Sequence, residues 1–329
     1  MESIYIFSGG TLKRKDNSLV LETENGRKHV PIENVGDIKV FGEVNMNKRF
    51  LEFMTKKRII VHFFNREGYY VGSYYPREYL NSGLIILKQA EYFMDKSKRL
   101  ELAKSFAMGG INSMLSVLKY YSRRGVKIDE RIRLIEELKS KINDQNSIDS
   151  IMGIEGNCRE VYYSAFNSIV KSEDFKIKRR EKRPPTNYMN TLISFGNSLM
   201  YTTVLSEVYK THLDPRIGFL HETNFRRFSL NLDVAEVFKP IIVDRVIFAL
   251  VNKGEIKKSD FSRVTEGLKL SDKGKRKFIE KFEEKLKTTI EHPKLKRKVS
   301  YRTIIRMELH KLEKHILGDE KYIPFGVRW

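Results

Sequence analysis

Apolar positions in the first 82 residues come in short runs separated by turn signals, a pattern typical of a β-rich domain. Leu19 to Leu21, followed by Asn25-Gly26, predicts a hairpin with a type I′ turn. The nearly continuous apolar run over residues 58–64 predicts a strand buried on both faces. A short helix is expected over residues 47–57, where apolar residues are spaced for one face. Residues 1–82 are therefore expected to form a small, sandwich-like β domain with one helix.

After Pro76 apolar residues recur at every third or fourth position, which predicts amphipathic helices. These helices are expected over residues 79–94, 99–121, 129–142, 147–170, 191–210, 232–251 and 301–317. Residues 83–95 are expected to be a linker or the start of the first long helix, and residues 96–329 a large all-α domain. The predicted fold class is therefore α+β, with a β-rich domain followed by a helical one.

Charge adds a prediction about the partner. The 329 residues include 62 Lys and Arg against 42 Asp and Glu, a formal net charge of +20. Most of the surplus lies after residue 90, so a nucleic acid is expected to bind there, with an anionic membrane or simple solubility as alternatives. Two basic segments look loop-like, residues 171–183 and 273–298. The first is expected to contact phosphates, whereas a solvated helix face is an equal alternative for the second.

Cysteine usage and hydropathy bear on where the protein works. Cys158 is the single cysteine, so no disulfide can form within the chain. The chain opens on a strand-like pattern rather than on a charged and then apolar leader, and no apolar run is long enough to span a bilayer. A cytoplasmic protein without membrane contact is expected.

Asp233 and Glu236 form an acid pair on the predicted 232–251 helix. Their three-residue spacing puts both carboxylates on one face, close enough to share a cation or to repel each other. Pro240 removes a backbone hydrogen bond from the same helix and should bend it. Taken alone, such an acid pair is most often a solvated surface. His221 follows an apolar lead-in and is, by itself, more often a hydrogen-bonded structural residue than a ligand.

Glu155 is a third candidate, and glycines flank it at positions 153 and 156. Each glycine costs a helix interior about 1 kcal/mol relative to alanine, so a ligand or another backbone is expected to approach closely there. The alternative for Glu155 is a surface ion pair with Arg159, four residues further on.

Together these segments resemble a known family. The blocks that carry the resemblance are Gly153-Ile154-Glu155-Gly156, Arg183-Pro184-Pro185, Asp214-Pro215-x-Ile217-Gly218-Phe219-Leu220-His221 and Ser229-Leu230-x-Leu232-Asp233-x-x-Glu236-x-Phe238-x-Pro240. In order and spacing, over essentially the whole chain, they are similar to the CRISPR-associated integrase–nuclease family, the larger of the two universal CRISPR adaptation proteins. Lys239 departs from the arginine that is common in the family, and Asn187 from an acid.

The resemblance implies that Glu155, His221 and Glu236 are metal ligands. It makes Asp233 a neighbouring acid that assists catalysis electrostatically or by supporting a ligand. One imidazole and two carboxylates suit Mn²⁺ or Mg²⁺. The implied activity is DNA cleavage and the insertion of spacer DNA into a CRISPR array. The implied partners are DNA, a second copy of the chain through the β-rich domain, and the smaller CRISPR-associated adaptation protein.

Basic residues near the ligand segments are the expected phosphate contacts. They are Arg179, Arg180, Arg183, Arg226, Arg227, Lys239 and Arg245. Two other interpretations of the chain stay open: a nucleic-acid-binding module without chemistry, and a structural scaffold of a larger complex. Metal-dependent turnover distinguishes the enzyme from both.

Overall fold

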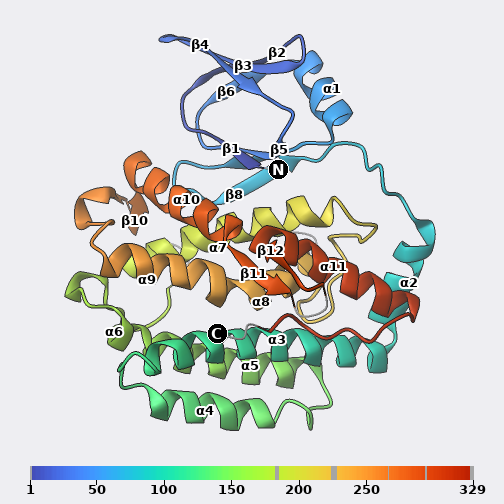
Figure 1. Ribbon diagram of the computed structural model, residues 1–329, viewed down its shortest axis with the longest axis vertical. Helices are drawn as coiled ribbons and strands as arrows, with labels where there is room; N and C mark the ends of the chain where they lie inside the picture. Colours follow the sequence, from blue (N-terminus) through green and yellow to red (C-terminus); the bar gives the residue numbers. More distant parts are fainter. Residues whose placement is uncertain (1, 182–184, 224–227, 266, 293–294, 327–329) are drawn as a thin grey trace. The chain divides into compact units, whose positions relative to one another are not determined.

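A computed structural model describes residues 2–181, 185–223, 228–265, 267–292 and 295–326 (Figure 1). The chain forms two compact units, residues 1–81 and 82–329. A β-rich region precedes a mainly helical one, so the predicted α+β class is confirmed.

Two four-stranded sheets make up the first unit. One sheet has the order β1 (Glu2–Ile6), β5 (Val35–Val40), β7 (Ile60–Phe64) and β8 (Tyr70–Tyr74), with β1, β5 and β7 parallel and β8 antiparallel. The other has the order β4 (Gly26–Pro31), β3 (Ser18–Thr23), β2 (Gly10–Lys15) and β6 (Val44–Met46). Strand β7 is buried along almost its whole length, because it pairs on both sides and both of its faces are covered.

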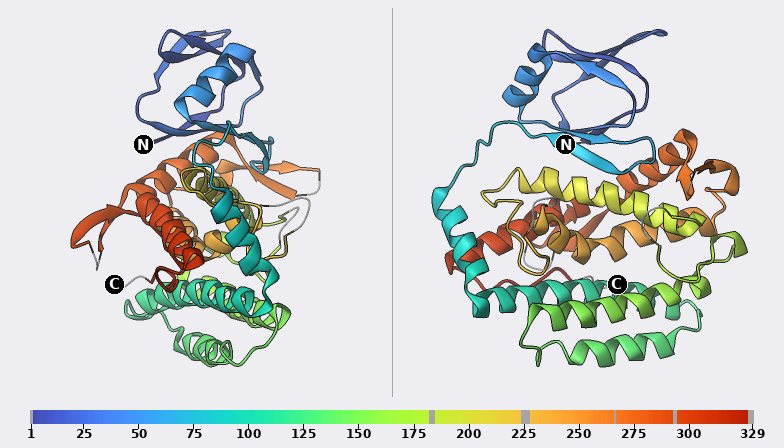
Figure 2. Two further views of the ribbon diagram at one scale, coloured as in Figure 1. Left: turned by 90° about the vertical axis from the view of Figure 1, so that its right-hand side faces the viewer. Right: turned by 180° about the vertical axis from the view of Figure 1, so that it is seen from behind.

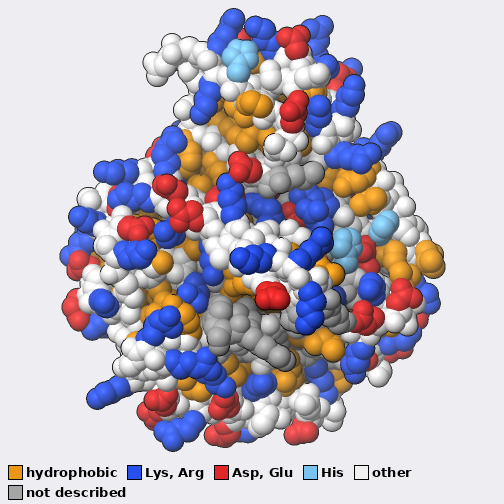
Figure 3. All heavy atoms as spheres, viewed as in Figure 1, with side chains coloured by type: hydrophobic (Ala, Val, Ile, Leu, Met, Phe, Trp, Pro, Cys, Tyr) orange, Lys and Arg blue, Asp and Glu red, His pale blue; other side chains and the backbone are white. Residues whose placement is uncertain are grey.

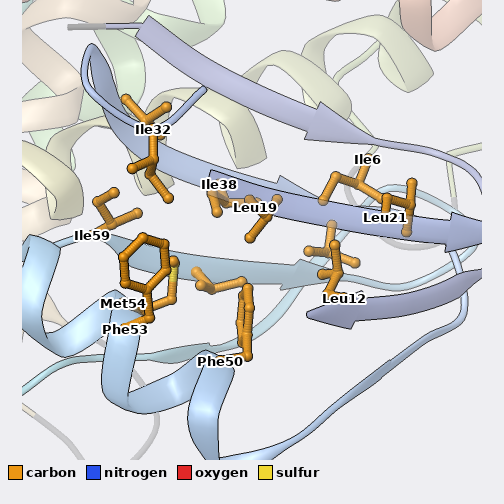
Figure 4. Packing of buried hydrophobic residues seen from close by; sticks show 13 residues of the cluster. Ile6, Leu12, Leu19, Leu21, Ile32, Ile38, Phe50, Phe53, Met54 and Ile59 are labelled. Atoms are coloured by element: carbon orange, nitrogen blue, oxygen red, sulfur yellow. The ribbon is translucent and has the colours of Figure 1, made fainter. Parts of the chain in front are cut away.

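Helix α1 (Lys48–Lys57) completes the core of this unit. Asn47 caps it by accepting a hydrogen bond from the backbone N–H of Phe50, as a short helix preceded by asparagine favours. Phe50, Phe53 and Met54 point from the helix into the apolar cluster formed by the strands (Figure 4). The apolar spacing of this segment therefore predicted both the helix and its buried face.

The hairpin between β3 and β4 forms, but its turn is not type I′. Thr23 pairs with Gly26, so the central residues of the turn are Glu24 and Asn25. A type I′ turn needs a positive φ at both central residues, and neither has one. The positive φ, 121°, instead occurs at Gly26, the residue that follows the two central positions of the turn.

The second unit is built mainly of helices (Figure 2). They are α2 (Gly83–Met94), α3 (Lys96–Ser122), α4 (Asp129–Ser140), α5 (Ile148–Ser164), α6 (Phe166–Ile169), α7 (Tyr188–Val208), α8 (Ser229–Lys239), α9 (Arg245–Asn252), α10 (Asp272–Lys287) and α11 (Tyr301–Leu317). Short 3₁₀ turns lie at η1 (Glu173–Phe175) and η3 (Lys258–Asp260). A π-helical turn, η2 (Pro240–Asp244), joins α8 to α9. No helix within the described ranges is long and apolar enough to cross a membrane.

The basic segment 273–298 is not a loop, so that prediction is wrong. It contains most of α10 and the hairpin of β11 (Thr289–His292) with β12 (Arg297–Ser300). Phe278, Phe282 and Leu286 bury the apolar stripe of α10 and leave its charges on the other face, as the helix-face alternative expected. A second hairpin, β9 (Phe261–Val264) with β10 (Gly267–Leu270), was also not predicted.

Helix α3 lies between α8 on one side and α4 and α5 on the other, and it packs against all three and against η2 (Figures 1 and 2). It continues without a break through Gly109 and Gly110. A Cβ at Gly109 would lie 2.7 Å from Pro324 Cβ and 3.1 Å from Val237 Cγ2. The glycines therefore allow α8 and the C-terminal segment to approach α3 closely, and α3 connects the helices that carry the candidate ligands.

Candidate metal and nucleic-acid site

Asp233 organises the loop that precedes α8. Its Oδ2 accepts hydrogen bonds from the backbone N–H groups of Phe219 (2.6 Å) and Leu220 (3.1 Å), and Oδ1 accepts one from His221 N (2.9 Å). The carboxylate is fully buried. Gly218 is required where this loop crosses α8, because a Cβ there would lie 2.6 Å from the backbone of Ser229.

The same carboxylate fixes the imidazole of His221. Its Nδ1 lies 2.9 Å from Asp233 Oδ1, so Nε2 points away from the carboxylate and has no hydrogen-bond partner among the described residues. Burial lowers the pKa of His221, but the hydrogen bond and charge of Asp233 outweigh it and leave the pKa raised. Asp233 and Glu236 do not share a cation, since Asp233 is committed to the loop.

Glu236 is the acid of α8 that faces other charges. Its Oε1 lies 2.6 Å from Lys239 Nζ, and its Oε2 lies 2.6 Å from Arg159 Nη2 on α5. The contact with Arg159 lacks hydrogen-bond angles, so the buried Oε2 atom has no hydrogen-bond partner in the described structure. Burial raises the pKa of Glu236, but the charges of Arg159 and Lys239 outweigh it and leave the pKa lowered.

Glu155 on α5 meets the same guanidinium. Nη2 of Arg159 contacts Glu155 Oε1 as well as Glu236 Oε2, so two carboxylates from different helices flank one nitrogen atom. The expected pair of Glu155 with Arg159 therefore forms, but the Glu155 side chain is only 16% exposed. Outside the helix itself, no described atom lies within 4 Å of a Cβ built at Gly153 or Gly156. The described residues therefore show no approach of another backbone to these glycines, and the approach of a ligand stays a prediction.

The predicted bend at Pro240 takes the form of the π-helical turn η2, which aligns a further acid with the site. Successive residues are rotated about the helix axis by about 100° in an α-helix and by roughly 80° in a π turn. Asp244 therefore comes back to the same helix face as Glu236. Both then face α5, where Tyr162 Oη donates a 3.0 Å hydrogen bond to Asp244 Oδ2. Burial raises the pKa of Asp244 to about 7, since its partner is a neutral phenol.

The three expected ligands gather in one region of the molecule. Glu155 and Glu236 contact the same atom, and His221 lies close enough to Glu236 to influence its pKa. Nevertheless, in the described residues no three His, Cys, Asp or Glu side chains already form a metal-binding group. The side chain of Arg159 lies between the two glutamates and contacts both.

The expected phosphate contacts have different environments. Arg179 is exposed, whereas Arg180 donates hydrogen bonds to Asn190 Oδ1 and Ser194 Oγ of α7 and so also stabilises the fold. Lys239 is paired with Glu236, and the guanidinium of Arg245 stacks 3.9 Å above the Tyr120 ring. Three further expected contacts lie outside the described residues: Arg183, Arg226 and Arg227. Figure 3 shows Lys and Arg side chains spread over the visible face of the helical unit.

The sequence pattern puts Asp244 on roughly the same stripe as Asp233 and Glu236 and offers Arg159 as a partner of Glu155, but it did not assign Arg159, Tyr162 or Asp244 to the site. The spacing of Glu155, Arg159 and Tyr162 puts all three on one helix face, so their proximity was available from the sequence. Nothing in the sequence indicated that α8 would present its own acid to the same arginine. The π turn that aligns Asp244 was equally hidden, because proline predicts a distortion but not its type.

A β-rich unit and a basic helical unit that gathers two glutamates and an oriented histidine are typical of enzymes that process nucleic acids. Comparison with known proteins narrows this class. The family described as CRISPR associated protein Cas1 matches residues 4–284. The chain is 56% identical to a CRISPR-associated endonuclease Cas1 of Thermotoga maritima over 98% of this chain and 99% of that relative.

Solved structures agree with this assignment. A Cas1 protein from Thermotoga maritima superimposes with a TM-score of 0.90 at 54% identity, covering 100% of both chains. A casposase bound to integration product has the same fold, with a TM-score of 0.89 at 22% identity over 98% of this chain and 93% of that one. The chain belongs to the Cas1 family of CRISPR-associated proteins, as its sequence motifs predicted.

Proposed function

We propose that this protein is a divalent-metal-dependent DNA endonuclease and integrase of CRISPR adaptation. It joins spacer DNA to a CRISPR array by attack of a DNA 3′-hydroxyl on a phosphodiester, and it cuts DNA when water attacks instead. The observation that carries the proposal is the meeting of Glu155 and Glu236 at one arginine, with the oriented His221 beside them. The relatives named as Cas1 endonucleases support it.

The donor set fits Mn²⁺ or Mg²⁺. Carboxylate oxygens suit both ions, and one imidazole nitrogen favours Mn²⁺. Two atoms are suited to accept a cation: His221 Nε2, which has no described partner, and Glu236 Oε2, which is buried without a hydrogen bond. Glu155, His221 and Glu236 would hold the ion. When bound, it would neutralise charge developing on the phosphate and activate the attacking hydroxyl.

The other residues of the site orient and bind. Asp233 holds His221 in the tautomer that protonates Nδ1 and keeps Nε2 available, as carboxylates behind ligand histidines do. Lys239 keeps a positive charge beside Glu236, where it can meet a phosphate as a point charge. The basic residues assigned to the DNA backbone are Arg179, Arg180, Arg183, Arg226, Arg227 and Arg245.

The assembly we propose is a homodimer that acts with the smaller CRISPR-associated adaptation protein. Joining both ends of a DNA fragment requires two active sites, which a dimer supplies. We assign dimerisation to the β-rich residues 1–82, because the candidate ligands all come from α5, α8 and the loop before α8. Residues 96–329 are the catalytic region in this proposal.

Metal-dependent chemistry tests the proposal. A labelled duplex and a plasmid carrying CRISPR repeats are incubated with the protein and its partner in Mn²⁺, in Mg²⁺ and in EDTA. Joining and cleavage are expected only with metal, and both should disappear in Glu155→Ala, His221→Ala and Glu236→Ala. DNA binding, measured by fluorescence anisotropy, should largely survive in all three variants.

Two outcomes contradict the proposal in different ways. Full turnover in one alanine variant would remove that residue from the site. Salt-sensitive DNA binding without any metal-dependent joining or cleavage would favour the non-catalytic binding module instead.

A further inference from the structure

Arg159 occupies the position between the two proposed carboxylate ligands. One of its nitrogen atoms contacts Glu155 from its own helix and, at 2.6 Å, Glu236 from α8. Burial lowers the pKa of Arg159, but the two acids outweigh it and raise the pKa, so the side chain stays charged. The Arg159 guanidinium therefore places a cation where the proposed function requires one.

We propose that Arg159 is a placeholder for the metal ion: it bridges Glu155 and Glu236 in the metal-free protein, gives way when the metal binds, and then contacts a DNA phosphate. This inference rests on the proposed function, since it takes both glutamates as metal ligands. In a metal-free site the two carboxylates would otherwise repel each other across the α5–α8 interface. Arg159 removes that repulsion while the ion is absent.

The charge of the site favours the exchange. With His221 neutral, as a ligand must be, Glu155, Glu236 and Asp233 stand against Arg159 and Lys239, which leaves one negative charge. A divalent ion turns this into one positive charge, and a single phosphodiester then neutralises it. Loading of the metal would therefore convert a site that repels DNA phosphates into one that attracts them.

The surroundings of Arg159 leave room for the movement. Its side chain is 20% exposed, so the guanidinium can reach solvent without any movement of α5. On the neighbouring helix surface, no described atom outside the helix lies within 4 Å of the position that a Cβ would take at Gly153 or Gly156. A long, flexible arginine can therefore swing over this surface toward a DNA strand, and its planar fork suits a phosphate there.

A purely structural arginine makes the opposite prediction about metal binding. If Arg159 only held the two glutamates in place, its removal would loosen the ligands and weaken metal binding. If it competes with the metal, its removal should strengthen metal binding, because the ion no longer has to displace it. The sign of the change therefore separates the two roles without any measurement of turnover.

The experiment titrates Mn²⁺ into the full-length protein by electron paramagnetic resonance, without DNA. Arg159→Gln should bind Mn²⁺ about tenfold more tightly than the wild type. Arg159→Lys, which retains the charge, should bind close to the wild-type value. Arg306→Gln is the matched control, because Arg306 pairs with the buried Glu207 away from this site, and it should leave Mn²⁺ affinity unchanged.

A second measurement follows the DNA. Anisotropy of a phosphorothioate-blocked duplex should show tighter binding in Mn²⁺ than in EDTA for the wild type, and most of that gain should vanish in Arg159→Gln. A third measurement uses only the wild-type protein, so it remains informative if the variant does not fold. Addition of Mg²⁺ should shift the Nε–Hε NMR signal of Arg159 and leave that of Arg306 in place.

The outcomes distinguish this inference from the proposed function. Equal or weaker Mn²⁺ binding by Arg159→Gln, or an Arg159 signal that Mg²⁺ does not move, overturns the placeholder and leaves the integrase intact. Absence of Mn²⁺ binding by every form, together with absence of metal-dependent joining, overturns the proposed function itself.

Discussion

Two glutamates of the helical unit have almost the same set of partners. Glu236 on α8 pairs with Lys239, three residues later, and with Arg159 from α5. Glu207 on α7 pairs with Lys210, also three residues later, and with Arg306 from α11. Burial raises the pKa of each acid, but in both cases the two cations outweigh it and leave the pKa lowered.

Glu207 and Glu236 differ in the charges that surround these ion pairs and in their exposure to solvent. Lys210 and Arg306 pair with the fully buried Glu207 carboxylate, and the charge that also acts on it is another cation, Arg302, which pairs with Glu283. Glu236 shares its arginine with a second acid, Glu155, and remains 12% exposed. A buried acid between two cations is therefore not by itself a sign of function. A second acid on the same cation, with access from outside, is what distinguishes the candidate site.

The largest expected effect is on turnover in Glu236→Gln. The amide keeps the size of the side chain but removes the charge that a metal ligand needs, so DNA joining and cleavage should fall on the order of a thousandfold. The melting temperature should change little, because Arg159 keeps its pair with Glu155. Single-turnover rates and thermal melts measure both quantities. Near-normal rates would make Glu236 equivalent to Glu207 and remove the contrast.

Glu207→Gln should show the reverse behaviour. It leaves Lys210 and Arg306 without their carboxylate at the packed α7–α11 interface, which should cost about 3 kcal/mol of unfolding free energy. The joining rate per folded molecule should stay within about twofold of the wild type. Denaturant unfolding checks the first quantity. A loss of rate with unchanged stability would assign Glu207 to the chemistry.

Asp244 extends the comparison to a buried acid whose hydrogen-bond partner among the described residues is the neutral Tyr162. Burial raises its pKa from 3.8 to about 7, so the folded protein holds the proton where the unfolded chain has released it. Stability should therefore fall as pH rises from about 4 to about 7, by about 1.4 kcal/mol per unit. Asp244→Asn has no such proton, so relative to the wild type it should gain about 3 kcal/mol between pH 5 and pH 8.

Paired unfolding curves of the wild type and Asp244→Asn at several pH values check this. All other groups titrate in the same way in both proteins. The difference in unfolding free energy between the two proteins therefore reports on Asp244 alone. If the difference in unfolding free energy between the two proteins stays constant with pH, the Asp244 carboxyl is ionised throughout the range, as expected for Glu207.

The smallest effect is expected at Gly156. Alanine there meets no neighbouring atom, so Gly156→Ala should stabilise the protein by about 1 kcal/mol through helix propensity alone. Gly156→Leu should fold equally well but weaken DNA binding, because it fills the surface beside Glu155. Thermal melts and anisotropy measure the two effects. Unchanged DNA affinity in the leucine variant would show that DNA does not approach this face of α5.

Much of the fold was predictable because each long helix carries its own apolar period. Helix α11 matches its predicted bounds, residues 301–317, and Asn47 marked the start of α1. The β11–β12 hairpin was not predictable, because its short strands are rich in charge and have little apolar alternation. The turn at Asn25-Gly26 failed for a related reason, since the pairing register is set by the whole hairpin and not by the dipeptide.

The site was predictable in its members but not in its arrangement. The family motifs named Glu155, His221, Asp233 and Glu236, and the structure gathers them in one region. The double role of Arg159 could not follow from its spacing to Glu155, because local spacing contains no information about the partner helix. That contact depends on how closely α3 draws α5 and α8 together.

The π-helical turn after α8 accommodates one residue more than an ordinary helix would over the same rotation. Ile241, Ile242 and Val243 are buried apolar residues and should exchange with other apolar residues of similar size. Five residues of a π turn and four of an α-helix each rotate the chain by about 400°, so removal of one residue from Pro240–Asp244 would restore an ordinary helix and leave α9 facing the same way. A second deletion has no such compensation and would rotate α9 by about 100°. Among relatives that keep this site, a segment one residue shorter is therefore expected to be tolerated, but larger changes of length are not.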